Sequence, residues 1–210
     1  MFQNRVDPLG RIIMTSARGS FMGNRGVIHN KQKQITHPFK HKAWITCALE
    51  FKGRKRTVMT VDHWTELFFL DEATAFAAGH RPCFECRKED AKRFKSCWIQ
   101  GNPLYNFSMT TSIKEIDEVI HRERIDGEKK KVMHQYMSSD IVEGIFVIIN
   151  ADPYLYSKGR LHRWTPFGYE NIIAVPECST LTVITPKSIV NAFRAGYAPQ
   201  IKECGITNDE

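Results

Sequence analysis

The 210-residue sequence has no long hydrophobic run. Its first residues, MFQNRVDPLGRIIM, contain no apolar stretch as long as the one a signal peptide requires. No later stretch approaches the roughly 20 consecutive apolar residues of a membrane-spanning helix. We therefore expect a soluble, cytoplasmic protein that does not insert into a membrane.

Several common motifs are also missing. The sequence has neither a P-loop nor a GxGxxG fingerprint, and no intact HNH spacing. The glycines and arginines between Arg18 and Gly26 could let backbone amides approach an anion, but without those motifs we favour a solvated hairpin there. Internal repeats and Ser/Pro/Gly-rich linkers are absent as well, which favours one compact unit.

Cysteine is sparse, with only six residues: Cys47, Cys83, Cys86, Cys97, Cys178 and Cys204. In an intracellular chain of this size they argue against a disulfide scaffold and for metal binding or simple burial. The last three are isolated from one another, and we expect them to behave as small buried hydrophobic residues.

Positive charge and apolar residues are plentiful. Hydrophobic residues make up 42% of the chain, enough for a core, and the formal net charge is +7. Such a charge attracts polyanions, including nucleic acid. We expect phosphate contacts from the residues of the basic clusters and of one helix: Lys52, Arg54, Lys55, Arg56, Lys92, Arg93, Arg122, Arg124, Lys129, Lys130 and Lys131.

The hydrophobic pattern predicts an α+β fold. We expect a hairpin over residues 43–61, a short helix between the N-cap Asp71 and Gly79, and amphipathic helices over 88–98 and 111–124. The remainder is β-rich, with strands near 143–150 and 181–185, a hairpin turning at Lys158–Gly159, and a last helix ending at Gly196. These features suggest four segments in one unit: 1–36, 37–98, 99–135 and 136–210.

The sequence Pro82-Cys83-Phe84-Glu85-Cys86 is a candidate zinc knuckle. A Cys-x-x-Cys spacing can direct two thiolates at one tetrahedral metal, and a preceding proline stiffens the turn. A pair of ordinary buried cysteines is the alternative. Two ligands do not complete a zinc site, so other parts of the chain must supply the rest.

The stretch FFLDEATAFAAGHRPCFECR, residues 68–87, resembles the second half of the Ada-type zinc-binding domain of bacterial alkylation-repair proteins. In that family a Cys₄ zinc site holds a thiolate that accepts a methyl group from a DNA methylphosphotriester, and the domain contacts DNA. The likeness is close over about a tenth of the chain and loose over residues 43–98. The rest of the chain resembles bacterial proteins that bring no function to carry over.

The resemblance implies a ligand set. Cys83 and Cys86 match the downstream pair of the family, and Cys47 falls where the upstream pair begins. The second upstream cysteine is missing, because position 51 is Phe51. His80, or alternatively His63, is then the nearest candidate for the fourth ligand, and a Cys₃His site of this kind favours a structural zinc over a reactive one.

Two catalytic alternatives remain open. A deaminase would need a glutamate two residues after Cys47. Glu50 lies three residues after it and therefore on the opposite face of a strand. His121 and Glu123, within a basic patch, are candidates for phosphodiester cleavage, although we favour a charged helix end and a solvated loop as the explanation of these residues.

These patterns together predict a zinc protein that binds nucleic acid, with DNA as the first candidate and zinc as a structural scaffold. The alternatives are a DNA-processing enzyme, which cleaves phosphodiesters or transfers a methyl group to zinc-bound Cys47, and a non-catalytic protein-interaction module.

Overall fold

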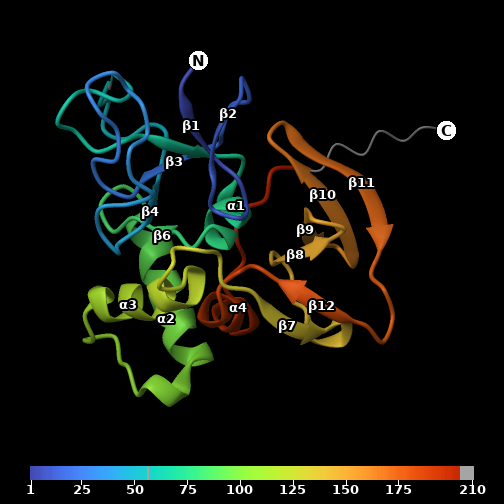
Figure 1. Cartoon of the computed structure of the whole chain (residues 1–210). Coiled ribbons are helices and arrows are strands. Elements are labelled where there is room, and N and C mark those ends of the chain that lie inside the picture. Colours follow the sequence, from blue (N-terminus) through green and yellow to red (C-terminus); the bar gives the residue numbers. More distant parts are fainter. Residues whose placement is uncertain (56, 204–210) are drawn as a thin grey trace.

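The computed structural model describes residues 1–55 and 57–203; Arg56 and the segment 204–210, which includes Cys204, lie outside the described residues. The described chain folds into two six-stranded sheets and a group of helices, which confirms the predicted α+β class (Figure 1). In Figure 1 the second sheet lies beside the first, with α1 between them.

The first sheet draws together strands that are distant in sequence, in the order β2-β1-β5-β3-β4-β6. Its strands are β1 Gln3–Val6, β2 Ile12–Met14, β3 Phe21–Asn24, β4 Ile45–Cys47, β5 Leu67–Phe69 and β6 Arg81–Pro82. The sheet is mixed, because β1 pairs with β5 and β4 with β6 in parallel while the other pairs are antiparallel.

The second sheet is antiparallel, with the order β11-β10-β9-β8-β12-β7. Its strands are β7 His134–Met137, β8 Phe146–Ile149, β9 Asp152–Ser157, β10 Arg160–Thr165, β11 Gly168–Ala174 and β12 Thr180–Val183. The predicted hairpin turning at Lys158–Gly159 joins β9 to β10 and is confirmed.

The four described α-helices are α1 Glu72–Ala77, α2 Lys88–Gly101, α3 Ile113–Arg124 and α4 Lys187–Arg194, with short 3₁₀ turns at Pro103–Tyr105 and Ser138–Asp140. Each predicted helix is present. On α2 the predicted apolar face of Ala91, Phe94 and Trp98 is fully buried. This face and those of α3 and α4 form one core cluster with residues of the second sheet, so the helices and that sheet share a core.

The hairpin predicted over residues 43–61 is wrong. Its first half contains only the short strand β4, which pairs with β3 and β6, and residues 57–61 form turns. Met59 has a positive φ of 55°, and its backbone N–H donates to Glu66 Oε2 at 2.8 Å. That buried side-chain acceptor replaces the strand partner that the alternating sequence suggested.

The short helix α1 begins as predicted and also joins the two halves of the chain. The Asp71 carboxylate accepts from the Thr74 backbone N–H at 2.8 Å and from the Tyr169 hydroxyl at 2.7 Å. The next residue, Glu72, accepts from the Arg87 guanidinium at 2.6 Å and the Tyr197 hydroxyl at 2.8 Å. Both acids are buried, so α1 is tied to β11 and to the chain beyond α4.

The boundary expected at residue 36 falls inside a single sheet, since β1 pairs with β5 and β3 pairs with β4 and β5 of the segment 37–98. The residues of the Ada-like segment are therefore part of a larger sheet rather than a separate module. None of the helices in the described ranges combines the length and hydropathy needed to cross a membrane.

Candidate metal centre

Three cysteine sulfurs gather at the end of the first sheet. The Sγ atoms of Cys47, Cys83 and Cys86 all lie within 4.8 Å of one another. Parallel pairing of β4 with β6 causes this, because it places Cys47 at the end of β4 beside the turn that follows Pro82. The Cys83 backbone N–H donates to Thr46 O at 2.9 Å and fixes that turn.

The three cysteines affect one another's pKa values through hydrogen bonds between their side chains. The pKa of Cys83 is lowered, first by a hydrogen bond from the Cys47 thiol and then by backbone N–H groups of Cys86 and Glu85. The pKa of Cys47 is raised, mainly because its proton is held against Cys83 and because it is buried. The cluster thus favours one thiolate beside two thiols, a donor set whose remaining protons a metal would displace.

The predicted histidine ligands do not join this cluster. His80 is fully buried, its Nε2 accepts from Arg25 Nε at 3.2 Å, and its ring packs against Phe69 and Trp44. His63 is exposed in a turn, with Nδ1 3.1 Å from Val61 O. Within the described ranges, only the three cysteines have donor atoms close enough to form the group.

A cavity of about 170 Å³ opens beside the sulfurs. Asn24, Phe51, Arg54, Trp64 and Glu85 are among its lining residues. Cys86 is only half-buried, so one sulfur faces accessible space. A metal held by the three cysteines would therefore keep a coordination position open toward this cavity, which fits zinc bound by three protein ligands.

The first basic cluster lies next to the metal centre. Lys52, Arg54 and Lys55 are exposed in the turn that follows β4. Arg54 Nη2 lies 2.8 Å from Glu85 Oε1, and Glu85 is between the two knuckle cysteines. The basic turn is therefore linked to the cysteine knuckle, while the predicted contact Arg56 lies outside the described residues.

The other predicted phosphate contacts are dispersed. Lys92 and Arg93 are exposed on α2, where Lys92 pairs with Glu89 at 3.1 Å. Arg122, Lys129 and Lys130 are exposed around the end of α3. Arg124 is only 1% exposed, so its prediction as a surface contact is wrong; its guanidinium donates to Gly79 O at 2.9 Å and Lys42 O at 2.7 Å. Lys131 Nζ turns inward and donates to Ala77 O.

His121 and Glu123 do not form a catalytic pair. His121 Nδ1 lies 2.6 Å from Arg124 Nη2, and its ring packs against Phe39 and Trp44. Glu123 Oε2 instead accepts from the backbone N–H of Ser188 at 2.8 Å and from its hydroxyl at 2.5 Å. The Glu123 carboxylate therefore accepts hydrogen bonds from the first turn of α4 and is not directed at His121.

Comparison with protein-family models, with curated proteins and with solved structures found no match. The Ada-type resemblance consequently stays a prediction that rests on residues 68–87.

Sequence reasoning missed Arg25 and Trp44, two buried residues from separate loops. Trp44 lies between the guanidinium groups of Arg25 and Arg124, each with Cζ 3.8 Å from the indole ring centre. Arg25 stood within a basic, glycine-rich stretch, which was a signal for anion contacts, but nothing local showed that it is buried against a tryptophan.

Proposed function

We propose that Cys47, Cys83 and Cys86 bind a zinc ion and that the protein binds nucleic acid, with DNA as the first candidate. The single observation that supports this proposal is the convergence of the three sulfurs within 4.8 Å. Thiolates are ligands that zinc prefers, and a three-sulfur set accepts a tetrahedral ion without rearrangement of the strands that present it.

The link between zinc and nucleic acid is the exposed basic turn. Glu85 holds Arg54, and the same turn carries Lys52 and Lys55. Zinc would immobilise the knuckle and, through that ion pair, hold the lysines of the turn in one position. Fixed cations at a phosphate backbone bind with less loss of side-chain entropy, and the net charge of +7 favours the encounter.

Metal analysis tests the first part. Purified wild-type protein should contain about one zinc per chain, while Cys47→Ser, Cys83→Ser and Cys86→Ser should each lose most of it. Cys178→Ser is the matched control, since Cys178 is exposed and outside the cluster, and should keep its zinc. Wild-type protein that is folded and free of bound metal, even after incubation with zinc, would refute the metal centre.

Salt-dependent DNA binding tests the second part. The affinity should fall steeply as salt rises, and Lys52→Ala with Lys55→Ala should reduce the slope of log K against log salt by about 2. Lys158→Ala, in the turn of the second sheet, is the control. Absence of DNA binding at low salt would contradict the nucleic-acid proposal and leave the metal proposal standing.

A second candidate is methyl transfer to a cysteine of the centre. The open side of the cluster and the half-buried sulfur of Cys86 favour it. A thiolate would attack the methyl carbon of a DNA methylphosphotriester, so that a sulfur–carbon bond forms, the carbon–oxygen bond breaks and a phosphodiester leaves. Mass spectrometry after incubation with methylated DNA should then show one added methyl group on Cys47 or Cys86. Three unmodified cysteines would exclude this activity.

A further inference from the structure

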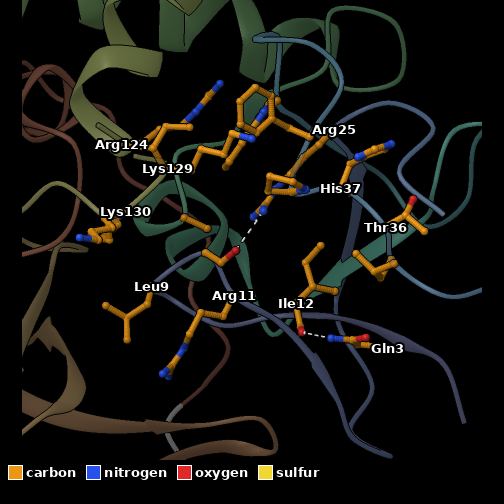
Figure 2. A pocket seen from close by; sticks show the side chains of 18 residues that line it. Gln3, Leu9, Arg11, Ile12, Arg25, Thr36, His37, Arg124, Lys129 and Lys130 are labelled. Atoms are coloured by element: carbon orange, nitrogen blue, oxygen red, sulfur yellow. Dashed lines mark hydrogen bonds between the residues drawn. The ribbon is translucent and has the colours of Figure 1, made fainter. Parts of the chain in front are cut away.

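A second cavity, of about 620 Å³, lies between the first sheet and the end of α3 (Figure 2). It is lined by residues from seven parts of the chain: Gln3, Leu9–Ile12, Arg25, Ile35–Phe39, Trp44, Ala78, and Arg124, Ile125 and Lys129–Lys131. None of these residues is acidic, although several are cationic. The cavity is separate from the cysteine cluster, with which it has no described lining residue in common.

The deepest cations of this cavity form a stack. Arg25 and Arg124 lie on the indole ring of Trp44, and the Trp44 Nε1–H donates to His41 O at 3.0 Å. Such cation–π contacts hold the two guanidinium groups in fixed orientations. Figure 2 shows Arg25 with Arg124 and Lys129 to one side of it and His37 and Thr36 to the other.

The buried cations have only neutral acceptors. Arg25 donates to Gly10 O at 2.9 Å and to His80 Nε2, and its Nη2 is buried without a partner. Arg124 donates to backbone carbonyls and His121, and its Nε is also unpaired. In the part of the chain that the structure describes, no carboxylate hydrogen-bonds Arg25, Arg124 or Lys131.

The acids around the cavity are paired with other cations. Asp7 acts on Arg25 electrostatically, but its carboxylate is held by the backbone N–H of Arg11 at 2.9 Å and by the Arg11 guanidinium at 2.6 Å. Asp117 acts on Arg124 electrostatically, but it pairs with Arg81 at 2.7 Å. Burial lowers the pKa of Arg25 to about 9 and that of Lys131 to about 7. A charge taken out of water without a counter-charge is costly, and an anionic ligand would remove that cost.

We propose that this cavity binds an organic phosphate of about nucleotide size. Its phosphate group would accept hydrogen bonds from Lys129 or Lys130 and would lie near the buried positive charges of Arg25 and Arg124, and its aromatic or apolar body would lie against Ile12 and Phe39. The volume falls within the range of small-molecule sites, and a mainly apolar lining with a few convergent charges is their usual composition. The ligand is a free nucleotide or the 5′-terminal phosphate of a nucleic acid strand.

Titration calorimetry and thermal unfolding of the full chain at low salt test this proposal. The probes are AMP, adenosine, pyrophosphate, and one oligonucleotide with a 5′-phosphate or a 5′-hydroxyl. AMP should bind saturably and raise Tm, and adenosine should bind at least about tenfold more weakly because it lacks the charged group. If the phosphorylated oligonucleotide binds and AMP does not, the source is a strand end; AMP binding that equals or exceeds it identifies a free nucleotide.

Two variants separate binding from folding. Arg25→Met should lower the AMP or 5′-phosphate affinity at least about tenfold, because it removes a buried positive charge of the cavity, and the Tm of the ligand-free variant shows whether the fold is kept. Lys129→Ala with Lys130→Ala changes only exposed positions and should weaken the same binding, while Lys158→Ala should not. Equal binding of 5′-phosphate and 5′-hydroxyl strands with no binding of AMP would overturn the proposal, and so would wild-type affinity in both cavity variants. Binding in this cavity does not involve the cysteine cluster or the basic turn that carries Lys52 and Lys55, so its failure would leave the proposed zinc and DNA binding untouched.

Discussion

Gly79 shows how one residue can decide the position of a buried side chain. It ends α1 with a φ of +84°, and a Cβ built there would lie 2.5 Å from Arg124 Cδ. Only a residue without a side chain both adopts this conformation readily and leaves room for the stem of Arg124. The arrangement of Arg124 against Trp44 therefore depends on a glycine that the sequence presents simply as a helix terminator.

Gly79→Ala should reduce the free energy of unfolding by about 2–4 kcal/mol, from the unfavourable φ together with the steric overlap. Urea unfolding measures this loss. Gly127→Ala is the matched control, because a Cβ there meets nothing within 4 Å, and it should change stability by less than about 0.5 kcal/mol. Equal effects of the two substitutions would contradict the packing described for Arg124.

The histidines near the cationic cavity should make the protein sensitive to acid. Burial lowers the pKa of His121 to about 4, helped by Arg124 and Lys42, and burial lowers that of His80 well below its ordinary value. The folded protein thus binds fewer protons than the unfolded chain between pH 6.5 and 4. The stabilisation is fully present above pH 6.5 and is lost as the pH falls through this window.

Urea unfolding at a series of pH values should accordingly show a decreasing free energy of unfolding from pH 7 to pH 4. His121→Gln should make the decrease shallower, because one group with a lowered pKa is removed. A free energy that is constant over this range would show that these histidines are not held neutral by the fold.

Among the elements, the helices were predictable and the first sheet was not. The periodicity of α2 and α3 and the cap at Asp71 are local signals, and each helix lies where they place it. The strands of the first sheet are short and pair with distant partners, so nothing in residues 43–61 showed that β4 pairs with β3. Cys47 could be placed with Cys83 and Cys86 only through a resemblance, since its approach depends on β4 lying beside β6.

The helices α2 and α4 approach each other closely at the end of α2. Gly101, the last residue of α2, lies so close to α4 that a Cβ would be 2.2 Å from Asn191 O. The adjacent Asn102 Nδ2 donates to Trp98 O at 2.7 Å and Ser188 O at 3.0 Å, bridging the two helices. These contacts make the crossing a close backbone approach that a larger residue would force apart.

Gly101→Ala should therefore cost about 1–3 kcal/mol and disturb the amides of α4 more than those of the second sheet. Thermal unfolding and hydrogen exchange of the α4 amides are the measurements. Gly168→Ala, where a Cβ meets nothing within 4 Å, is the control for the loss of a glycine. Unchanged exchange in α4 would contradict the close contact.

At the scale of the whole molecule, the Glu72 carboxylate links α1 to the start of α2 and to the chain beyond α4. The carboxylate pairs with Arg87 at 2.6 Å, and both side chains are buried. It also accepts from the Tyr197 hydroxyl and from the backbone N–H of Gln200 at 2.8 Å. A neutral residue at this position would leave Arg87 paired with the partly exposed carboxylate of Asp90 at 2.7 Å and with the Thr46 hydroxyl at 3.2 Å.

Glu72→Gln should reduce the free energy of unfolding by about 3 kcal/mol, because it leaves a buried cation partly uncompensated. Limited proteolysis should also cut the chain near Gln200 sooner than in the wild type. Glu89→Gln removes the exposed partner of Lys92 and should cost less than about 1 kcal/mol. Similar losses from both substitutions would mean that Glu72 does not couple α1 to α2 and to the chain beyond α4.

The pairing of α1 with the distal chain also affects the order in which a growing polypeptide can complete its structure. The carboxylates of Glu72 and Asp71 accept hydrogen bonds from the backbone N–H groups of Gln200 and Lys202, which are made 128 and 131 residues later. Glu72 can pair with Arg87, and Asp71 can cap α1, as soon as those residues are made, but the contacts with Gln200 and Lys202 must form last. The cysteine knuckle, whose partners Cys47 and Thr46 are made earlier, has no such delay, so a metal ion could organise the first part of the chain before the second has been synthesised.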